Sequence, residues 1–182
     1  MLASKYGGIG GDSPNSSISV TLGQIRTIKV NVMGDVKVPG TYRLSSFSTV
    51  FSALYRAGGV SGTGSLRAIK VVRGGKQVAT VDVYGYPFDG KSDSDIRLED
   101  DDIVIVPPYV GLVDIKGDVK RPMRYEMKED ETLDDLIAYA GGFAGEAYKE
   151  DVRVVRATGA EKEIYTVAAK DFKTCKMADG DE

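Results

Sequence analysis

The chain contains no histidine and no tryptophan among its 182 residues, and it has a single cysteine. The lack of histidine excludes His-based acid–base catalysis, Ser-His-Asp triads and histidine-ligated metals. One cysteine cannot form an internal disulfide or a CxxC pair. Without tryptophan the strongest sugar-stacking side chain is missing, although 10 tyrosines remain. We therefore expect no enzyme, no cofactor and no metal.

Long apolar runs and a strong net charge are also missing. No apolar run approaches the roughly 18 residues that a membrane-spanning helix needs. With 24 basic and 27 acidic residues the net charge is −3, which argues against a nucleic-acid binder that works through a basic surface. The composition, 42% hydrophobic and 28% charged, is that of an ordinary globular protein.

Residues 1–23 are small, polar and rich in glycine and serine, and they lack the apolar core of a signal peptide. They are expected to be a flexible lead or the remnant of an upstream domain. Ile18, Val20 and Leu22 alternate as in an edge strand at the end of such a domain. Either the protein is cytosolic, or the chain is a fragment whose targeting segment lies upstream.

An internal repeat is the main feature of the sequence. Residues 31–73 align without a gap with residues 114–156 and share 14 identities in 43 positions. This agreement predicts two copies of one domain, a first copy at 24–109 and a second copy at 110–182. The turn residues that recur in the two copies are Gly34, Pro39, Gly58 and Gly59, and Gly117, Pro122, Gly141 and Gly142.

The offset of the repeat changes near the C-terminus. Leu98–Asp102 matches Met177–Asp181 at an offset of 79 instead of 83, so the second copy has lost about four residues, in the loop that the first copy has at 84–95. The first copy continues into an apolar strand at 103–106. The second reaches Glu182 where that strand would begin, so we expect it to lack its last strand, as a fragment would.

The repeat has the pattern strand, strand, helix, strand, strand, strand, of which the second copy is expected to lack the last strand. Alternating apolar residues predict hairpins at 28–44 and 69–82 in the first copy. Helical spacing predicts short helices after Thr49 (or Ser48) and after Thr132, and the glycine pairs end them. One helix on one face of a mixed sheet is the β-grasp, or ubiquitin-like, arrangement. The predicted fold class is therefore α+β, with two tandem β-grasp domains.

The order of these motifs resembles the soluble-ligand-binding β-grasp (SLBB) domain. The resemblance rests on Val-x-Val-x-Gly-x-Val-x-x-Pro-Gly-x-Tyr at 30–42, Ala-Gly-Gly at 57–59, Val-x-Arg at 71–73 and Leu-x-x-x-Asp-x-Val-x-Val-Pro at 98–107. Tandem copies resemble the periplasmic part of Wza-type polysaccharide export proteins of the outer membrane. The second copy departs from the motif, with Met123 in place of glycine and no last strand.

The resemblance implies a non-enzymatic segment of a capsular or exopolysaccharide export translocon at the periplasmic face of the outer membrane. It implies polysaccharide as a partner, a ring oligomer of the complete protein, and contact with an inner-membrane polymerisation or co-export protein. The two copies carry charges of +2 and −5, which would suit a head-to-tail ring. Two alternatives stay open: a monomeric glycan or small-ligand module without a transport role, and, with less support, an enzyme subunit.

Seven side chains are candidates for ligand binding. Tyr42 and Tyr125 occupy equivalent positions of the repeat, as do Arg73 and Arg156. They are candidates because tyrosine can stack on sugar rings and arginine can bridge hydroxyls or acidic sugars. We favour the alternative, that the tyrosines pack on the helix and the arginines are solvated. Loop aromatic residues are better candidates for an exposed contact surface. These are Tyr84, Tyr86 and Phe88.

Three further patterns have a structural alternative that we favour. An acidic segment could bind Ca²⁺, but it lacks the spacing of a calcium loop and reads as a solvated turn. The glycine pairs follow a helix, so they read as helix C-caps and not as phosphate cradles. Asp134 and Asp135 point about 100° apart on a helix and cannot flank one glycosidic bond. The acidic segment comprises Asp93, Asp95, Glu99, Asp100, Asp101 and Asp102.

Overall fold

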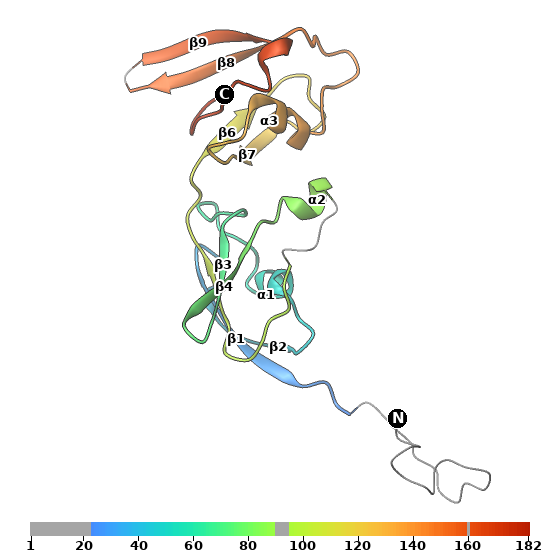
Figure 1. Cartoon of the computed structure of the whole chain (residues 1–182), viewed down its shortest axis with the longest axis vertical. Helices are drawn as coiled ribbons and strands as arrows, with labels where there is room; N and C mark the ends of the chain where they lie inside the picture. The colour runs from blue at the N-terminus through green and yellow to red at the C-terminus, as the bar shows by residue number, and fades with distance from the viewer. Residues whose placement is uncertain (1–22, 90–94, 160) are drawn as a thin grey trace, which may run out of the picture.

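The computed structural model describes residues 23–89, 95–159 and 161–182. The expectations for the lead, including its alternating segment 18–22, and for Asp93 lie outside the described residues. The two copies follow one another along the long axis of the molecule, with the first copy in the middle of the view and the second at the top (Figure 1).

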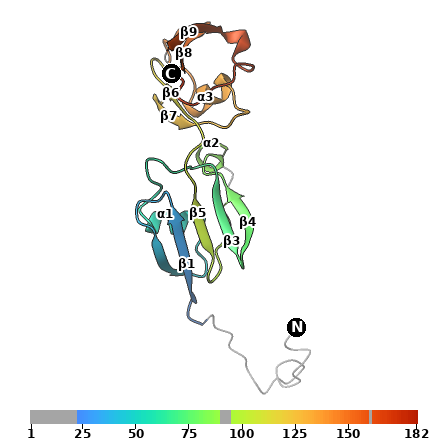
Figure 2. The same cartoon turned by 90° about the vertical axis from the view of Figure 1, so that its left-hand side faces the viewer.

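The first copy forms a five-stranded mixed sheet in the order β2-β1-β5-β3-β4. The central pair, β1 and β5, is parallel, and every other neighbouring pair is antiparallel. Figure 2 shows this sheet from its open face. The strands are β1 (Thr27–Gly34), β2 (Gly40–Ser45), β3 (Ile69–Arg73), β4 (Lys76–Val81) and β5 (Ile103–Val106).

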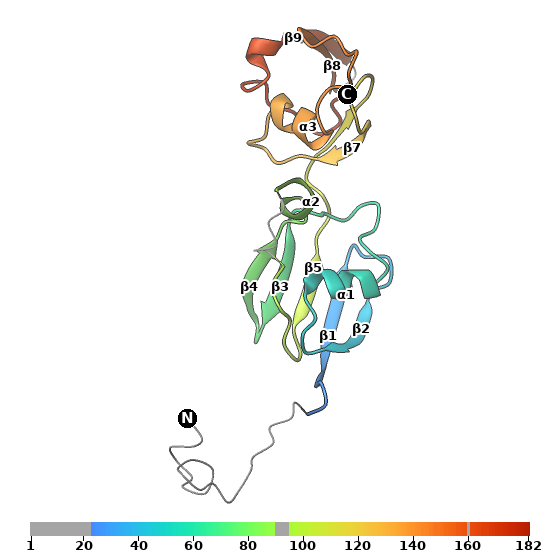
Figure 3. The ribbon, with the colours of Figure 1, turned by 90° about the vertical axis from the view of Figure 1, so that its right-hand side faces the viewer.

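One helix, α1 (Val50–Arg56), covers the other face of this sheet (Figure 3). The inward side chains of the central strands alternate with outward ones, and Val30, Val71 and Val104 are completely buried beneath the helix. A seven-residue helix is too short to be stable alone, so packing on the sheet holds it in place. The α+β fold predicted from the hydrophobic pattern is confirmed.

The second copy repeats this plan with one strand fewer. Its two hairpins are β6 (Leu112–Ile115) with β7 (Met123–Glu126), and β8 (Asp151–Thr158) with β9 (Glu161–Ala168). The helix α3 (Leu133–Tyr139) packs against them. Within the described part of the chain no strand joins β6 to β8, so the sheet is divided into two separate hairpins.

Both helices begin and end as the sequence predicts. Thr49 and Thr132 are the N-caps, and the Asp135 carboxylate accepts the backbone N–H of Thr132 at 2.8 Å. After each helix the backbone turns into the left-handed region, with φ of +78° at Gly58 and +81° at Gly141. Residues with a Cβ rarely adopt this conformation, which explains the glycine pairs as helix ends.

The loop 84–95 contains a short helix that the pattern did not predict, α2 (Gly85–Asp89). It lies between the two copies in the views of Figures 1 and 3. The difference arises because aromatic side chains of this segment pack against neighbouring elements, and tertiary packing can order a segment whose local propensity is weak. This helix places the three loop aromatic residues in different environments.

Candidate functional site

The acidic segment of each copy folds into a turn around one buried carboxylate. Asp102 accepts the backbone N–H of Glu99 at 2.8 Å and both Nε and Nη2 of Arg73 at 2.8 Å. In the second copy, Asp181 accepts Nε and Nη2 of Arg156 at 2.9 and 2.6 Å. Both carboxylates are completely shielded from solvent. These matching contacts show that Asp181 is the structural counterpart of Asp102, in agreement with the change of offset from 83 to 79.

The two candidate arginines are therefore occupied by these turns. Hydrogen bonds to Asp102 and Asp181 raise the pKa of Arg73 and of Arg156 above the ordinary value. Arg73 also contacts the Glu99 carboxylate at 2.6 Å. Because most of their donors are already used, the arginines are structural clamps rather than freely solvated residues, and a role in ligand binding stays a prediction.

Tyr42 and Tyr125 each close the turn that contains the proline of their copy, Pro39 or Pro122. The hydroxyl of Tyr42 donates to the carbonyl oxygen of Val38 at 2.5 Å, and that of Tyr125 to the carbonyl oxygen of Arg121 at 2.9 Å. Tyr125 is buried and Tyr42 half-buried. These contacts fit the packing interpretation, and the binding role of this pair also stays a prediction.

Gly180 and Asp101 occupy the same place in the two acidic turns, with φ of +81° and +64°. A Cβ at Gly180 would meet nothing within 4 Å, so only backbone strain opposes a larger residue. We expect Gly180→Ala to lower the free energy of unfolding by about 1–2 kcal/mol, whereas Gly180→Asp costs less, because aspartate tolerates this region better than alanine. Urea denaturation of both variants tests this, and equal costs would contradict it.

Tyr84 and Phe88 extend from the first copy into the core of the second. Tyr84 is only 8% exposed, and its hydroxyl accepts the backbone N–H of Glu126 at 2.8 Å. The ring centroids of Tyr84 and Phe88 lie 5.2 and 5.0 Å from that of Tyr139. The expectation of an exposed surface is thus wrong for Tyr84, because the second copy covers it, and Phe88 is half-buried.

Arg67 is the centre of the contact between the copies. It is 7% exposed and its guanidinium stacks on the ring of Tyr84, 4.5 Å from the centroid. It forms ion pairs with Glu131 of the second copy at 2.5 Å and with Asp82 of the first at 3.2 Å. Burial alone would lower the pKa of Arg67, but the hydrogen bonds to these two carboxylates outweigh it and raise the pKa. The guanidinium therefore stays charged.

The buried carboxylate of Glu126, in the second copy, also joins the two copies. Glu126 accepts the hydroxyl of Ser65 at 2.6 Å and the backbone N–H of Leu66 at 2.7 Å. No buried side-chain nitrogen or oxygen of the described residues lacks a hydrogen-bond partner, so this polar contact is fully satisfied. We refer to the following set as the joint: Ser65, Arg67, Asp82, Tyr84, Glu126, Glu131 and Tyr139.

The joint should weaken at low pH through Asp82. Burial raises the pKa of Asp82, but hydrogen bonds from Lys128, Arg67 and the Tyr84 backbone together lower it by more than burial raises it. The net shift of this pKa is therefore downward. A lowered folded-state pKa stabilises the fold above the unfolded-state value of about 3.9, and this contribution is lost as the pH falls through the folded-state value. We expect the acid-induced fall in unfolding free energy to be shallower in Asp82→Asn, which urea titrations between pH 7 and 3 test.

Sequence reasoning missed the joint, although the repeat contains a signal for it. At the joint residues within the aligned repeat the two copies differ in chemistry, because these residues contact the other copy instead of repeating an internal role. The signal is weak, since 29 of the 43 aligned positions differ. The pairs are Arg67 with Glu150, Arg43 with Glu126, Ser48 with Glu131, and Arg56 with Tyr139.

An open cleft with aromatic walls lies between α1 and α2 on the first copy, with a volume of about 520 Å³. Tyr55 is 85% exposed and Tyr86 56% exposed. The ring of Tyr86 packs edge-on against that of Phe51, with centroids 5.6 Å apart. Asp95 fixes the start of the helix, since its carboxylate accepts the Phe51 backbone N–H at 3.0 Å. We refer to this feature as the aromatic cleft. Its lining includes Phe51, Ser52, Tyr55, Val60, Tyr86 and Asp95.

The aromatic cleft belongs to the first copy alone. At the positions of Phe51 and Tyr55 the second copy has Asp134 and Ala138, and the loop that supplies Tyr86 is shortened there. Of the three loop candidates, only Tyr86 is therefore exposed and accompanied by a second exposed aromatic residue. An accessible aromatic ring can stack on the apolar face of a sugar, and two such rings line this cleft.

The described ranges offer neither a metal site nor a membrane-spanning helix. Nowhere in them do three or more His, Cys, Asp or Glu side chains gather as a group that could hold a metal ion. Of the acidic segment, Asp95 instead fixes the start of α1, and the residues from Glu99 to Asp102 support their turn and the neighbouring strands. Likewise, none of the helices in the described ranges has the length and apolar character to cross a membrane.

Comparison with known proteins agrees with the repeat. One SLBB domain model matches residues 28–106 and another SLBB domain model matches residues 112–167. Two Escherichia coli proteins, both named polysialic acid transport protein KpsD, are each 27% identical to this chain over 169 residues. The match covers 91% of this chain, which spans about 30% of the length of those relatives. The chain belongs to the SLBB family and carries two SLBB domains in tandem, one in each copy of the repeat.

Proposed function

We propose that the chain is a non-enzymatic segment of a protein that exports capsular polysaccharide or exopolysaccharide, acting at the periplasmic face of the outer membrane. One observation carries this proposal: tandem SLBB domains align over 91% of the chain with proteins named for polysialic acid transport. The buried charged groups support a non-enzymatic role. Within the joint, and within each acidic turn, they form ion pairs that hold the fold together.

The aromatic cleft is the surface at which we propose that the polysaccharide is contacted. Tyr55 and Tyr86 offer exposed ring faces, and Ser52 and Asp95 offer hydrogen-bonding groups beside them. None of the described residues that line the cleft is lysine or arginine. A neutral stretch of sugars should therefore bind better than an anionic one, since none of these described lining residues is a cation that could compensate a carboxylate.

The joint would hold this cleft in a fixed orientation. Its buried ion pairs and stacked rings connect the two copies, so a polymer that contacts the first copy meets a defined surface of the second. In the complete protein we propose a ring oligomer that contacts an inner-membrane polymerisation or co-export protein. The charges of +2 and −5 on the two copies suit a head-to-tail contact.

A monomeric glycan-binding module is the second candidate, because the aromatic cleft would serve it equally well. The oligomeric state of the complete protein separates the two candidates. Light scattering and crosslinking should show a closed oligomer for the export segment. A strict monomer that still binds oligosaccharide would favour the second candidate.

The proposed function is tested in the host cell by deleting the gene and restoring it with variants. We expect loss of surface polysaccharide on deletion, recovery with the unchanged gene, and poor recovery with Tyr55→Ala/Tyr86→Ala. Phe47→Ala is the matched control, because Phe47 is 57% exposed and lies outside the cleft. Surface polysaccharide that is unaffected by deletion would contradict an export role.

A further inference from the structure

A second hollow, with a volume of about 290 Å³, lies beside the aromatic cleft at the place where the two copies meet. Its walls come from both copies, so it exists only while the joint holds them together. The buried rings and carboxylates of the joint close its inner side, and its outer part is open to solvent. We refer to it as the crevice. Its lining includes Val60, Ser61, Leu66, Tyr109, Leu112 and Arg124.

The crevice and the aromatic cleft are continuous with one another. Val60 and Leu66 line both of them. Consecutive side chains just before α2 also connect the two, because Val83 lines the cleft and Tyr84 lines the crevice. A polymer that leaves the cleft past Val60 and Leu66 therefore enters the crevice, and the two hollows form one groove along the first copy and onto the second.

Backbone contacts fix the first-copy wall of the crevice. A Cβ on Gly64 would collide with the carbonyl oxygen of Asp35, so the loop 61–66 lies directly against the chain that follows β1. The N–H of Tyr109 donates to the carbonyl oxygen of Thr63 at 3.0 Å, which holds this tyrosine beside the loop. Because the wall is already ordered, a ligand does not have to bear the entropic cost of ordering it.

Arg124 presents a hydrogen-bond donor of fixed orientation from the second copy. Its Nε and Nη2 donate to the two carboxylate oxygens of Asp114 at 3.0 and 2.8 Å, whereas its Nη1 makes no hydrogen bond among the described residues. The hydroxyl of Tyr109 likewise has no hydrogen-bond partner in the described ranges. An aromatic ring and a guanidinium that line one hollow suit a sugar, because the ring stacks on its apolar face and the guanidinium donates to its hydroxyls.

The charges around the crevice favour an uncharged sugar. Asp114 neutralises Arg124, so no net positive charge is left to attract a carboxylate. Glu126 adds a buried negative charge, although its oxygens already accept the Ser65 hydroxyl and the Leu66 N–H. The crevice therefore prefers the same class of ligand as the aromatic cleft.

We propose that the crevice is a second subsite for a neutral oligosaccharide, in which Tyr109 and Arg124 contact the sugars that extend beyond Tyr55 and Tyr86. The inference rests on the proposed function, because it extends the ligand of the aromatic cleft. A short oligosaccharide fills the cleft alone, whereas a longer one reaches both subsites, so affinity rises with chain length. The crevice has fewer exposed rings than the cleft, so it strengthens binding that the cleft anchors and does not hold the sugar by itself.

The test titrates the ¹⁵N-labelled chain and its variants with maltotriose and with maltohexaose. In the unchanged chain we expect maltohexaose to bind about tenfold more tightly than maltotriose. Tyr109→Ala and Arg124→Met should each weaken the binding of maltohexaose by about fivefold, the effect of losing one good polar or stacking contact, and leave that of maltotriose unchanged. Tyr55→Ala/Tyr86→Ala should abolish the binding of both sugars.

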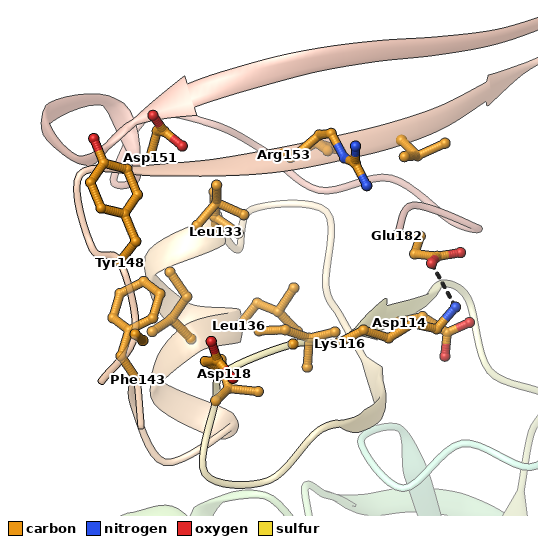
Figure 4. Close-up of a pocket in the computed structure, with 18 of the residues that line it drawn as sticks. Asp114, Lys116, Asp118, Leu133, Leu136, Phe143, Tyr148, Asp151, Arg153 and Glu182 are labelled. Carbon is orange, nitrogen blue, oxygen red and sulfur yellow. Dashed lines mark ion pairs between the residues drawn. The ribbon is translucent and has the colours of Figure 1, made fainter. Parts of the chain in front are cut away.

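Tyr148→Ala and Arg153→Met are the matched controls. Both side chains are exposed and lie in the second copy at another pocket, between α3 and β8 (Figure 4), and neither lines the groove. These controls should bind both sugars like the unchanged chain. If the two sugars bind equally well, or if the crevice variants behave like the controls, the crevice is not a subsite, although the cleft remains one. If neither sugar binds the unchanged chain, the cleft fails as a polysaccharide contact and the crevice fails with it.

Discussion

Replacing Arg67 with methionine is expected to lower the free energy of unfolding by about 3–5 kcal/mol. Arg67 is 7% exposed and neutralises Glu131 and Asp82 at the contact between the copies. Methionine fills a similar volume but leaves these carboxylates without their shared cation. Breaking a buried ion pair on one side is costly, because the remaining charge is still largely removed from water.

Differential scanning calorimetry and urea denaturation measure this effect. In Arg67→Met we also expect the two copies to unfold in separate steps, since the joint links their cores. Arg124→Met is the matched control: Arg124 forms a bidentate pair with Asp114, yet its side chain is 60% exposed. The control should cost much less, because solvent screens an exposed ion pair. Similar losses in both variants would show that the joint contributes no more than a surface ion pair.

The second large effect is expected at the carboxylates of the acidic turns. Asp102→Ala removes a fully buried carboxylate that holds Arg73 and the backbone of Glu99, and we expect a loss of about 3–5 kcal/mol. Asp181→Ala removes the equivalent group in the second copy. In the described part of the chain no strand pairs between β6 and β8 after this turn, so the loss should be smaller and should affect the second copy alone.

Amide hydrogen exchange assigns each loss to a copy. Faster exchange confined to β1, β3 and β5 in Asp102→Ala, and confined to β6 and β8 in Asp181→Ala, is the expected pattern. Asp134→Ala is the control, because this aspartate is exposed in the first turn of α3 and contributes less than about 1 kcal/mol through the helix dipole. If Asp102→Ala resembled this control, the clamp role of the buried carboxylate would be wrong.

The fold was predictable because the sequence states it twice. Glycine pairs after each helix, threonine before it, and the alternating strands define the same elements at two places in the chain. The change of offset from 83 to 79 predicted that Asp181 matches Asp102, and the matched hydrogen bonds of these two carboxylates confirm it. Such local signals are strong because backbone geometry restricts the residues that can occupy these positions.

The contact between the copies was not predictable in the same way. Arg67 and Glu131 are 64 residues apart, and neither lies in a motif. Charged residues are usually solvated, so only their positions in three dimensions show that these two are buried together. Tyr84 illustrates the same limit, because its place in a loop favoured exposure while the second copy buries it. The helix α2 follows from this packing and has no local signal of its own.

The central claim is that the aromatic cleft of the first copy contacts polysaccharide. A titration of the ¹⁵N-labelled chain with maltohexaose, followed by backbone amide shifts, tests it directly. We predict saturable shifts at about millimolar ligand, strongest at Phe51, Tyr55 and Tyr86 and their neighbours, weaker with oligosialic acid and abolished in Tyr55→Ala/Tyr86→Ala. Shifts that are absent with both sugars, or that fall on the second copy and persist in the double variant, would contradict the claim.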